Sequence, residues 1–325
     1  MATAAQVKAL IESHAQGDAE RFYNVALQVA AHAARTGHTR FATELRELID
    51  KAKAGATSRP PSKPIPFVQP RGELAGLLTA GYPKQRLHDL VLEPALHNRI
   101  QKVLREQRQQ ERLKEHGFKP QRKLLLIGPP GTGKTMTAGV LAGELGLPLF
   151  TIQLHALITK FMGETAAKLR LIFDAMLQTR AVYLFDEFDA FGSDRGAKND
   201  VGEIRRVLNS FLLFLEQDES DSLVIAATNH HGLLDRALFR RFDAFIEYTL
   251  PSSALAKEIM RVRLGVLEVE DVDWNAATNA ASGLSHAEIA RACEQAAKHA
   301  ILEHTTKVET DVLVAALTER QSSRS

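Results

Sequence analysis

A glycine-rich loop followed by a lysine and a threonine is the most informative chemical feature of the chain. Residues 123–137 read KLLLIGPPGTGKTMT and match the phosphate-loop pattern G-x-x-x-x-G-K-[ST] at every fixed position. The glycines allow a tight turn whose backbone N–H groups point at phosphate oxygens, while Lys134 supplies a cation and the Thr135 hydroxyl suits Mg²⁺. A helix expected from Met136 to about Leu145 would point its positive dipole end at the anion. The predicted phosphate-binding residues are Gly128, Pro129, Pro130, Gly131, Thr132, Gly133, Lys134, Thr135 and Met136.

Two adjacent acids end a second apolar run, in the segment VYLFDEFD. Beside a phosphate loop, Asp186 belongs near Mg²⁺, and Glu187 can orient and deprotonate an attacking water as a general base. A lone Asp-Glu pair is most often a solvated surface feature. Its position at the end of a hydrophobic strand, downstream of a phosphate loop, favours the catalytic interpretation here.

Polar residues in the following segments complete a candidate hydrolytic site. Asn229 closes the run SLVIAATN, where a side chain at the carboxyl end of a strand faces the ligand crevice and can sense the γ-phosphate. Arg240 and Arg241, in LFRRF, do not obviously belong to the phosphate site of their own subunit. We expect their guanidinium groups to act at the phosphate site of a neighbouring subunit. There they would neutralise charge that develops on the γ-phosphoryl group.

Short apolar runs alternate with helical patterns through the middle of the chain. This alternation predicts the α/β class, with a parallel sheet covered by helices on both faces. The predicted strands are residues 124–127, 149–153, 181–185, 223–227 and 245–248. After Pro251 the pattern predicts only helices, at 252–264, 274–281, 285–304 and 310–320, and Ser285 with Glu288 forms a capping-box pattern.

Two further segments precede this α/β region. Residues 1–54 repeat apolar side chains at helical spacing and predict three helices packed as a small bundle. Residues 55–81 contain several prolines and predict a semi-extended linker. The predicted domains are therefore an N-terminal helical domain (1–54), a linker (55–81), a large α/β domain (82–250) and a C-terminal helical domain (251–325).

The composition limits the class of protein. The chain has 325 residues, of which 45% are hydrophobic and 25% charged, as in globular proteins that bury a core, and its net charge of +2 gives no general attraction for nucleic acid. A single cysteine, Cys293, excludes an internal disulfide framework and a cysteine-based zinc site. The first residues lack the order of a signal peptide, and no apolar run reaches the length of a membrane span. We therefore expect a cytoplasmic protein without a membrane partner.

Five motifs together resemble those of a known family. GPPGTGKT, VYLFDEFDAFG, AATN, LFRRFD and GLSHAEI occur in the order and spacing of AAA ATPases. The chain resembles the AAA family proper, as in katanin, spastin and the FtsH ATPase module, in a bacterial-type single-ring form with a small N-terminal helical domain. This resemblance implies a large α/β domain with a helical lid, ATP and Mg²⁺ bound between them, and assembly into homo-hexameric rings.

The resemblance also implies roles for individual residues. Asn229 matches the first sensor, and Arg240 with Arg241 matches paired arginine fingers. Gly283 and Ala287 lie in the second-sensor region of the lid, where Ala287 stands at a position that is often Arg in wider AAA+ proteins. The segment KFMGET resembles a pore loop that grips a peptide by apolar contact. Its residues are Lys160, Phe161, Met162 and Gly163.

This resemblance implies an ATPase that couples hydrolysis to unfolding or remodelling a protein threaded through a central pore, with the N-terminal helices recruiting an adaptor or substrate. Two alternatives are a nucleic-acid motor or loader and a nucleotide-regulated recruitment switch. An aromatic Phe161 favours protein over DNA as the threaded chain, and intact Glu187 and Arg240 argue against a pure switch. The basic stretch 99–123 interleaves Glu with Lys and Arg, which indicates an ion-paired face rather than a nucleic-acid site. The sequence contains no HExxH peptidase motif.

Overall fold

The computed structural model describes residues 72–157, 162–191, 200–230, 240–265 and 267–322, together with six isolated positions between residues 26 and 70. The chain divides into two units, Met1–Pro64 and Ile65–Ser325. The three-helix bundle predicted for residues 1–54 lies outside the described residues, apart from five helical positions. All that follows concerns the second unit.

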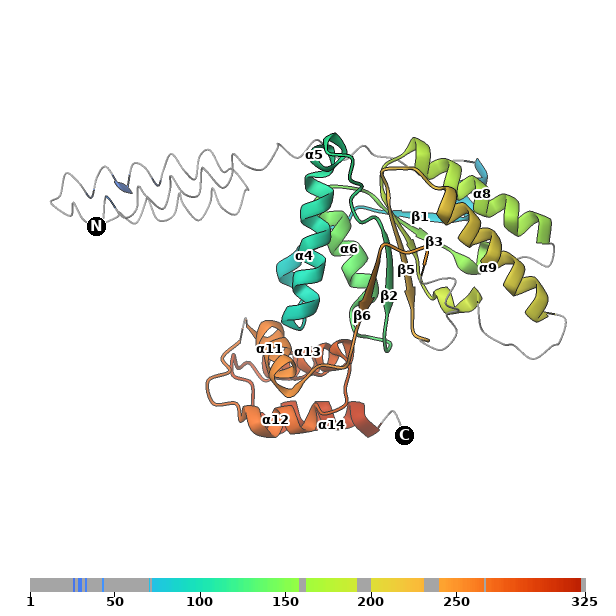
Figure 1. Ribbon diagram of the computed structural model, residues 1–325. Coiled ribbons are helices and arrows are strands. Elements are labelled where there is room, and N and C mark those ends of the chain that lie inside the picture. Colours follow the sequence, from blue (N-terminus) through green and yellow to red (C-terminus); the bar gives the residue numbers. More distant parts are fainter. Residues whose placement is uncertain are drawn as a thin grey trace. The chain divides into compact units, whose positions relative to one another are not determined.

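A six-stranded sheet forms the centre of this unit, in the order β1-β3-β4-β5-β2-β6 (Figure 1). Strands β3, β4, β5, β2 and β6 are parallel to their neighbours, and only the edge strand β1 runs antiparallel, beside β3. The bounds are β1 Leu78–Gly81, β2 Lys123–Ile127, β3 Leu149–Ile152, β4 Val182–Phe185, β5 Leu223–Thr228 and β6 Ala244–Glu247.

Helices cover both faces of the sheet. On one face lie α4 and α6, and on the other lie α8 and α9 (Figure 1). The bounds in this α/β part are η1 Gly72–Gly76, η2 Leu87–Asp89, α4 Pro94–Arg108, α5 Gln110–Glu115, α6 Lys134–Leu145, α7 Leu154–Leu157, α8 Met162–Gln178, η3 Phe188–Phe191 and α9 Asp200–Gln217.

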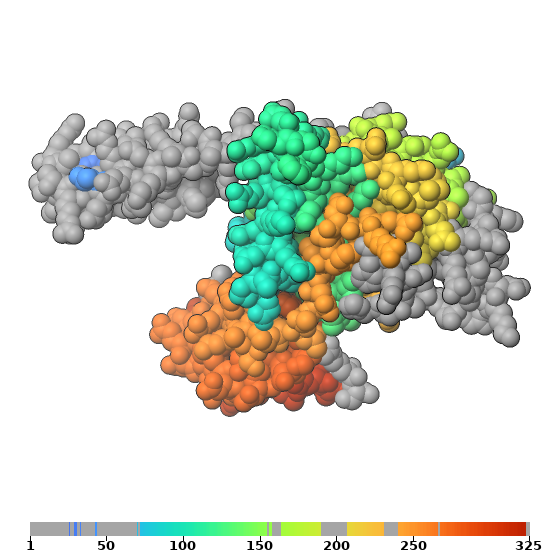
Figure 2. Space-filling view, in the orientation of Figure 1, coloured from blue at the N-terminus to red at the C-terminus, as the bar shows by residue number. Residues whose placement is uncertain are grey.

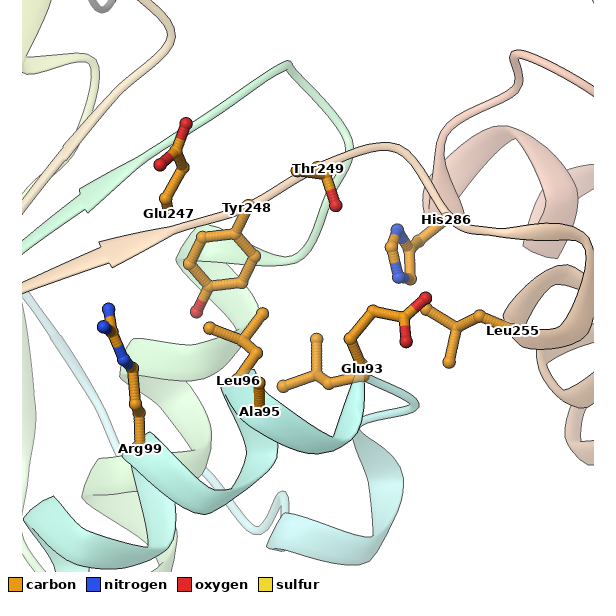
Figure 3. A pocket seen from close by; sticks show the side chains of 10 residues that line it. Glu93, Ala95, Leu96, Arg99, Glu247, Tyr248, Thr249, Leu255 and His286 are labelled. Carbon is orange, nitrogen blue, oxygen red and sulfur yellow. The ribbon is translucent and has the colours of Figure 1, made fainter.

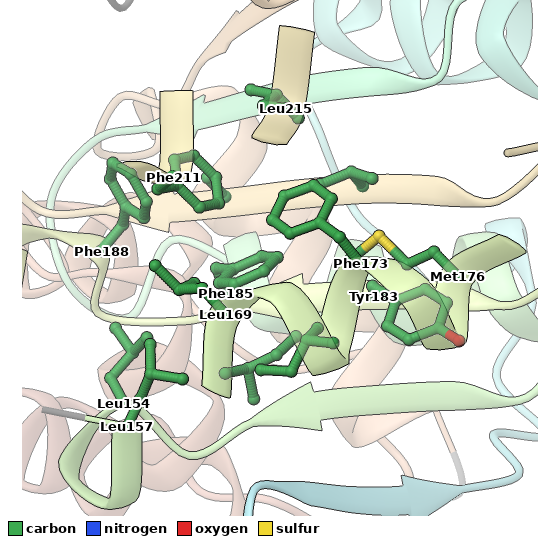
Figure 4. Packing of buried hydrophobic residues seen from close by; sticks show 14 of the residues in the cluster. Leu154, Leu157, Leu169, Phe173, Met176, Tyr183, Phe185, Phe188, Phe211 and Leu215 are labelled. Atoms are coloured by element: carbon green, nitrogen blue, oxygen red, sulfur yellow. The ribbon is translucent and has the colours of Figure 1, made fainter. Parts of the chain in front are cut away.

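Alternation along the strands explains the two apolar layers. In β2, Leu125 and Ile127 pack toward α8 and α9, while Leu124 and Leu126 pack toward α4 and α6. Since successive strand residues point to opposite faces, a strand buried on both sides is apolar at nearly every position. Aromatic rings fill the α8–α9 layer, where Phe185 and Phe211 meet edge to face with centroids 4.9 Å apart (Figure 4).

After β6 the chain is helical and forms a separate apolar core. Cys293 is fully buried in this core, and burial raises the pKa of its thiol to about 12, so it remains protonated. The Ser285 side chain accepts the backbone N–H of Glu288, whose carboxylate accepts that of Ser285, so the predicted capping box is confirmed. The helices are α11 Ser253–Leu264, α12 Trp274–Ala280, α13 His286–Leu302 and α14 Thr310–Ser322.

The predicted α/β class and the C-terminal helical region are thus confirmed, but the structure adds one element. Strand β1, at 78–81, lies inside the segment that the sequence analysis assigned to the linker, because pairing with the distant β3 gives this short run its regular structure. The surface of the C-terminal helical lid adjoins that of α4 (Figure 2). Near the start of α4, the Ser252 hydroxyl donates to the Glu93 carboxylate at 2.7 Å.

Candidate active site

The phosphate loop connects β2 to α6 in a conformation that glycine permits. Gly128, Gly131 and Gly133 have φ values of 152°, 74° and 102°, a region that other residues rarely adopt. A Cβ atom on Gly128 would lie 2.3 Å from the backbone oxygen of Tyr248. The loop therefore requires glycine for two reasons: its backbone conformation and its close packing against the end of β6.

Lys134 lies folded back onto this loop. Its ammonium group donates to the carbonyl oxygens of Gly128 and Pro129 at 2.7 and 2.8 Å, and the residue is 7% exposed. Burial lowers the pKa of Lys134, while the charges of Asp186 and Asp189 oppose this effect. Within the described residues the hydrogen bonds of this buried cation go to neutral carbonyls, and it is well suited to exchange them for phosphate oxygens, which are negatively charged.

The acidic pair lies at the carboxyl end of β4, on the same edge of the sheet as the loop. The Thr135 hydroxyl donates to one carboxylate oxygen of Asp186 at 2.7 Å, and the backbone N–H of Glu187 donates to the other at 2.9 Å. A hydroxyl and a carboxylate in contact are a donor set that Mg²⁺ favours. Glu187 is exposed and has a positive φ of 50°, which is uncommon outside glycine and concentrates at functional sites.

A further acid, Asp189, joins this turn to the end of β5. Its carboxylate accepts the Thr228 hydroxyl at 3.1 Å and the backbone N–H of Asn229 at 3.3 Å. The exposed Asn229 is thereby fixed beside the acidic pair. No role was predicted for Asp189 from the sequence, although it lies two residues after the acidic pair.

The lid contacts the phosphate loop through the start of α13. The backbone N–H of Ala287 donates to the carbonyl of Gly131 at 2.9 Å, and a Cβ on Gly131 would meet the Ser285 hydroxyl at 2.6 Å. The Leu90–Val91 segment bridges the two parts, because Leu90 is buried in the core with α4 and α6 while Val91 packs against the lid core. Gly283 precedes α13 with a positive φ of 78°.

A pocket of about 220 Å³ lies beside this contact, between α4, the end of β6 and the lid (Figure 3). His286, the first residue of α13, and Glu93, just before α4, lie on facing sides of it. Both ring nitrogens of His286 are buried, and the described residues provide neither with a hydrogen-bond partner. Burial lowers the pKa of His286, and the Glu93 charge only partly opposes this.

This histidine predicts a pH dependence of stability. The unfolded chain binds a proton at His286 near pH 6.5, whereas the folded chain does so only at lower pH, so stability falls as the pH decreases below about 6.5. We expect His286→Gln to lose less thermal stability between pH 7.5 and 5.5 than the parent chain. His299→Gln, at an exposed position of the same helix, is the control. Equal losses in the parent and His286→Gln would contradict the prediction.

The structure separates the paired arginines from their own phosphate loop. They precede β6, whose Ala244 pairs with Leu124 near the amino end of β2, while the phosphate loop follows the carboxyl end of β2. Four rises of roughly 3.3 Å along the strand, from Leu124 to Gly128, place the two ends about 13 Å apart. Arg240 is exposed, and Arg241 Nε lies 3.3 Å from a carboxylate oxygen of Glu216.

Lys160 and Phe161 of the predicted pore loop lie outside the described residues, and Met162 and Gly163 begin α8. The basic stretch is engaged in ion pairs: Arg108 with Glu144 at 2.5 Å and Lys114 with Asp221 at 2.8 Å. None of the helices in the described part of the chain has the length and apolar character required to cross a bilayer.

Comparison with known proteins gives a consistent result. The family model described as "ATPase family associated with various cellular activities (AAA)" matches residues 124–250. The chain is 33% identical over 313 residues to "Uncharacterized AAA family ATPase y4kL" of Sinorhizobium fredii, an alignment that covers 95% of this chain and 92% of that protein.

Longer proteins match over a smaller share of their length. The chain is 36% identical over 203 residues to "ATP-dependent zinc metalloprotease FtsH" of Karelsulcia muelleri, covering 60% of this chain and 33% of that protein. It is 33% identical over 253 residues to "ATP-dependent zinc metalloprotease FtsH 1" of Methylacidiphilum infernorum, covering 75% of this chain and 37% of that protein. The chain thus spans roughly a third of these relatives.

Proposed function

The chain belongs to the AAA family and is an ATPase, and from this premise we propose that it forms a homo-hexameric ring in the cytoplasm that remodels proteins. One observation supports assembly into a ring: the paired arginines lie near the amino end of β2, whereas their own phosphate loop follows the carboxyl end of β2. An arginine side chain is shorter than strand β2, which separates the paired arginines from that loop. The charge that hydrolysis develops on one subunit is therefore neutralised by the next subunit.

Binding uses the loop and its lysine. The N–H groups around Gly131 and Gly133 face the phosphates, and the Lys134 ammonium moves from the carbonyls of Gly128 and Pro129 to the β- and γ-phosphate oxygens. Thr135 and Asp186 would hold Mg²⁺, which supplies Lewis-acid neutralisation of phosphate charge. Closure of the lid over the loop, through Ala287 and Gly131, excludes water from the bound nucleotide.

Hydrolysis then requires one water in line with the γ-phosphorus. The Glu187 carboxylate accepts a proton from that water, and Asn229 orients it or the γ-phosphate by hydrogen bonding. The contacts of Asp189 with Thr228 and the backbone of Asn229 keep β5 and the acidic turn in register during this step. Arg240 and Arg241 of the neighbouring subunit stabilise the transferred phosphoryl group.

Protein, rather than nucleic acid, is the proposed substrate of the ring. Two features support this: the similarity to ATPase segments of proteins named ATP-dependent zinc metalloproteases, and the apolar pore-loop segment Lys160–Gly163. Phe161 and Met162 can grip any peptide by apolar contact. The ion pairs of the basic stretch, such as Arg108 with Glu144, leave it less suited to phosphate backbones.

Phe161→Ala tests this proposal. We expect basal ATP hydrolysis to stay within a few-fold of the parental rate, because Phe161 is proposed to contact substrate and not nucleotide. Stimulation of hydrolysis by an unfolded protein, and unfolding of a fluorescent substrate protein, are expected to be lost. Phe161→Tyr keeps an aromatic ring and is expected to retain both.

Two results would contradict the proposal. Loss of basal hydrolysis or of folding in Phe161→Ala would identify Phe161 as a core residue. Strong stimulation by single-stranded DNA, with none by unfolded protein, would instead favour a nucleic-acid motor.

A further inference from the structure

Asp243, two residues after the arginine pair, connects that segment to the start of β2. One oxygen of its carboxylate accepts the backbone N–H groups of Arg122 and Lys123, each at 2.9 Å. Its own backbone N–H donates to the carbonyl of Lys123 at 2.8 Å. Three hydrogen bonds thus hold this one residue to the amino end of the strand whose other end is the phosphate loop.

Arg122 and Lys123, which anchor Asp243, are themselves hydrogen-bonded to the carboxyl end of α9 and to the residue that follows it. The Arg122 guanidinium donates to the carboxylate and the backbone carbonyl of Asp218, whose side chain is fully buried. The Lys123 ammonium donates to the carbonyl of Leu215. These charged groups form the wall of a polar pocket of about 340 Å³ that also includes Glu216 and Asp243.

Glu216 connects the same helix directly to the arginine pair. Its carboxylate lies 3.3 Å from Arg241 Nε, so α9 contacts the segment on one side while β2 holds it through Asp243. This cluster, within the described residues, joins α9, β2 and the arginine segment by hydrogen bonds and an ion pair. It surrounds the segment that a neighbouring subunit would use.

We propose that Asp243 is a positioning residue for hydrolysis in the neighbouring subunit: it fixes the Arg240–Arg241 segment to β2 so that the guanidinium groups meet that subunit's γ-phosphate. This inference rests on the proposed function. Long side chains on an unanchored turn would sample many conformations, and a misplacement of about 1 Å in a catalytic group costs on the order of 10² in rate. At each interface, Asp243 is therefore needed in the subunit that donates the arginine side chains. It is not needed in the neighbouring subunit whose nucleotide is hydrolysed there.

The test is made on the full-length protein with Asp243→Ala. We expect the affinity for a fluorescent ATP analogue to be unchanged, because the phosphate loop is intact, and ATP turnover to fall about 100-fold. Mixing Asp243→Ala with Lys134→Ala is expected to restore turnover, since the latter subunit donates an anchored arginine segment to an intact phosphate site. Mixing Asp243→Ala with Arg240→Ala is expected to restore none, since both subunits lack a competent arginine segment.

Two further variants separate positioning from folding. Asp243→Asn keeps an oxygen that can accept both backbone N–H groups, and we expect it to retain most turnover. Asp221→Ala removes an exposed carboxylate at the same end of the sheet, where it pairs with Lys114, and is expected to behave as the parent. If Asp243→Ala does not fold, Asp243→Ser, which keeps a polar but shorter side chain, enters the same mixtures.

Parental turnover in Asp243→Ala would overturn the inference. Failure of both mixtures to restore turnover would also overturn it, because it would indicate a general structural defect in Asp243→Ala. Failure of the proposed function has a different signature. If the Arg240→Ala, Arg241→Ala double variant keeps full turnover, the arginine segment has no role in hydrolysis, and the inference falls with it.

Discussion

Replacing Arg240 or Arg241 by alanine is expected to lower ATP turnover by about 10³–10⁵-fold while the affinity of the same subunit for nucleotide is unchanged. The reason is the position of the segment, at the edge of the sheet opposite its own phosphate loop. Phosphate release at a protein concentration that saturates assembly, together with titration of a fluorescent nucleotide, measures the two quantities separately.

A matched control is Arg291→Ala, which removes an exposed arginine from the lid helix α13 and is expected to keep parental turnover. The parent itself should show turnover per subunit that rises steeply with protein concentration, because an isolated subunit lacks the arginine of its neighbour. Parental turnover in both single arginine variants would show that these side chains do not serve the reaction.

The second large effect is expected for Glu187→Gln. Geometry and nucleotide binding should survive, because Thr135, Asp186 and Lys134 keep their contacts, whereas the proposed general base is removed. General-base catalysis is typically worth about 10²–10⁴-fold, and turnover should fall by that factor. Single-turnover hydrolysis of bound ATP measures the chemical step without product release.

Glu219→Gln provides the comparison, since it changes an exposed glutamate remote from the phosphate loop. Glu187→Gln is also expected to retain ATP for longer than the parent and so to hold substrate protein in pull-down experiments. If Glu187→Gln hydrolysed ATP at the parental rate, another group would be the base.

The parallel sheet was predictable because its strands are short and mostly apolar, as in β2, β4 and β5. A strand buried on both faces, such as β4, is apolar at nearly every position, and the glycine-rich loop after β2 marks which end binds phosphate. Strand β1 was not predictable. Only four residues form it, and its regular structure depends on hydrogen bonds to β3, about seventy residues later in the chain.

Some residues of the candidate site were likewise predictable from the sequence, and others were not. Lys134, Thr135 and the Asp186–Glu187 pair are local patterns whose proposed chemistry follows from residue type and spacing, and the structure brings Thr135 and Asp186 into contact. The proposed roles of Asp243 and His286 depend instead on partners far away in sequence. These partners are the backbone of Arg122 and Lys123 for Asp243, and a pocket opposite Glu93 for His286. Residue type and spacing do not indicate contacts between residues so far apart in sequence, because such contacts arise only when the chain folds.

Mixing two inactive variants tests the central claim, that each catalytic site is completed by a second copy of the chain. Lys134→Ala lacks the cation for its own nucleotide but keeps its arginine segment, and Arg240→Ala has the opposite defect. Each variant alone should show little turnover, and their mixture should regain a substantial part of the parental rate, because some interfaces join an intact phosphate loop to an intact arginine segment. A mixture no more active than the sum of its separate components would contradict the account.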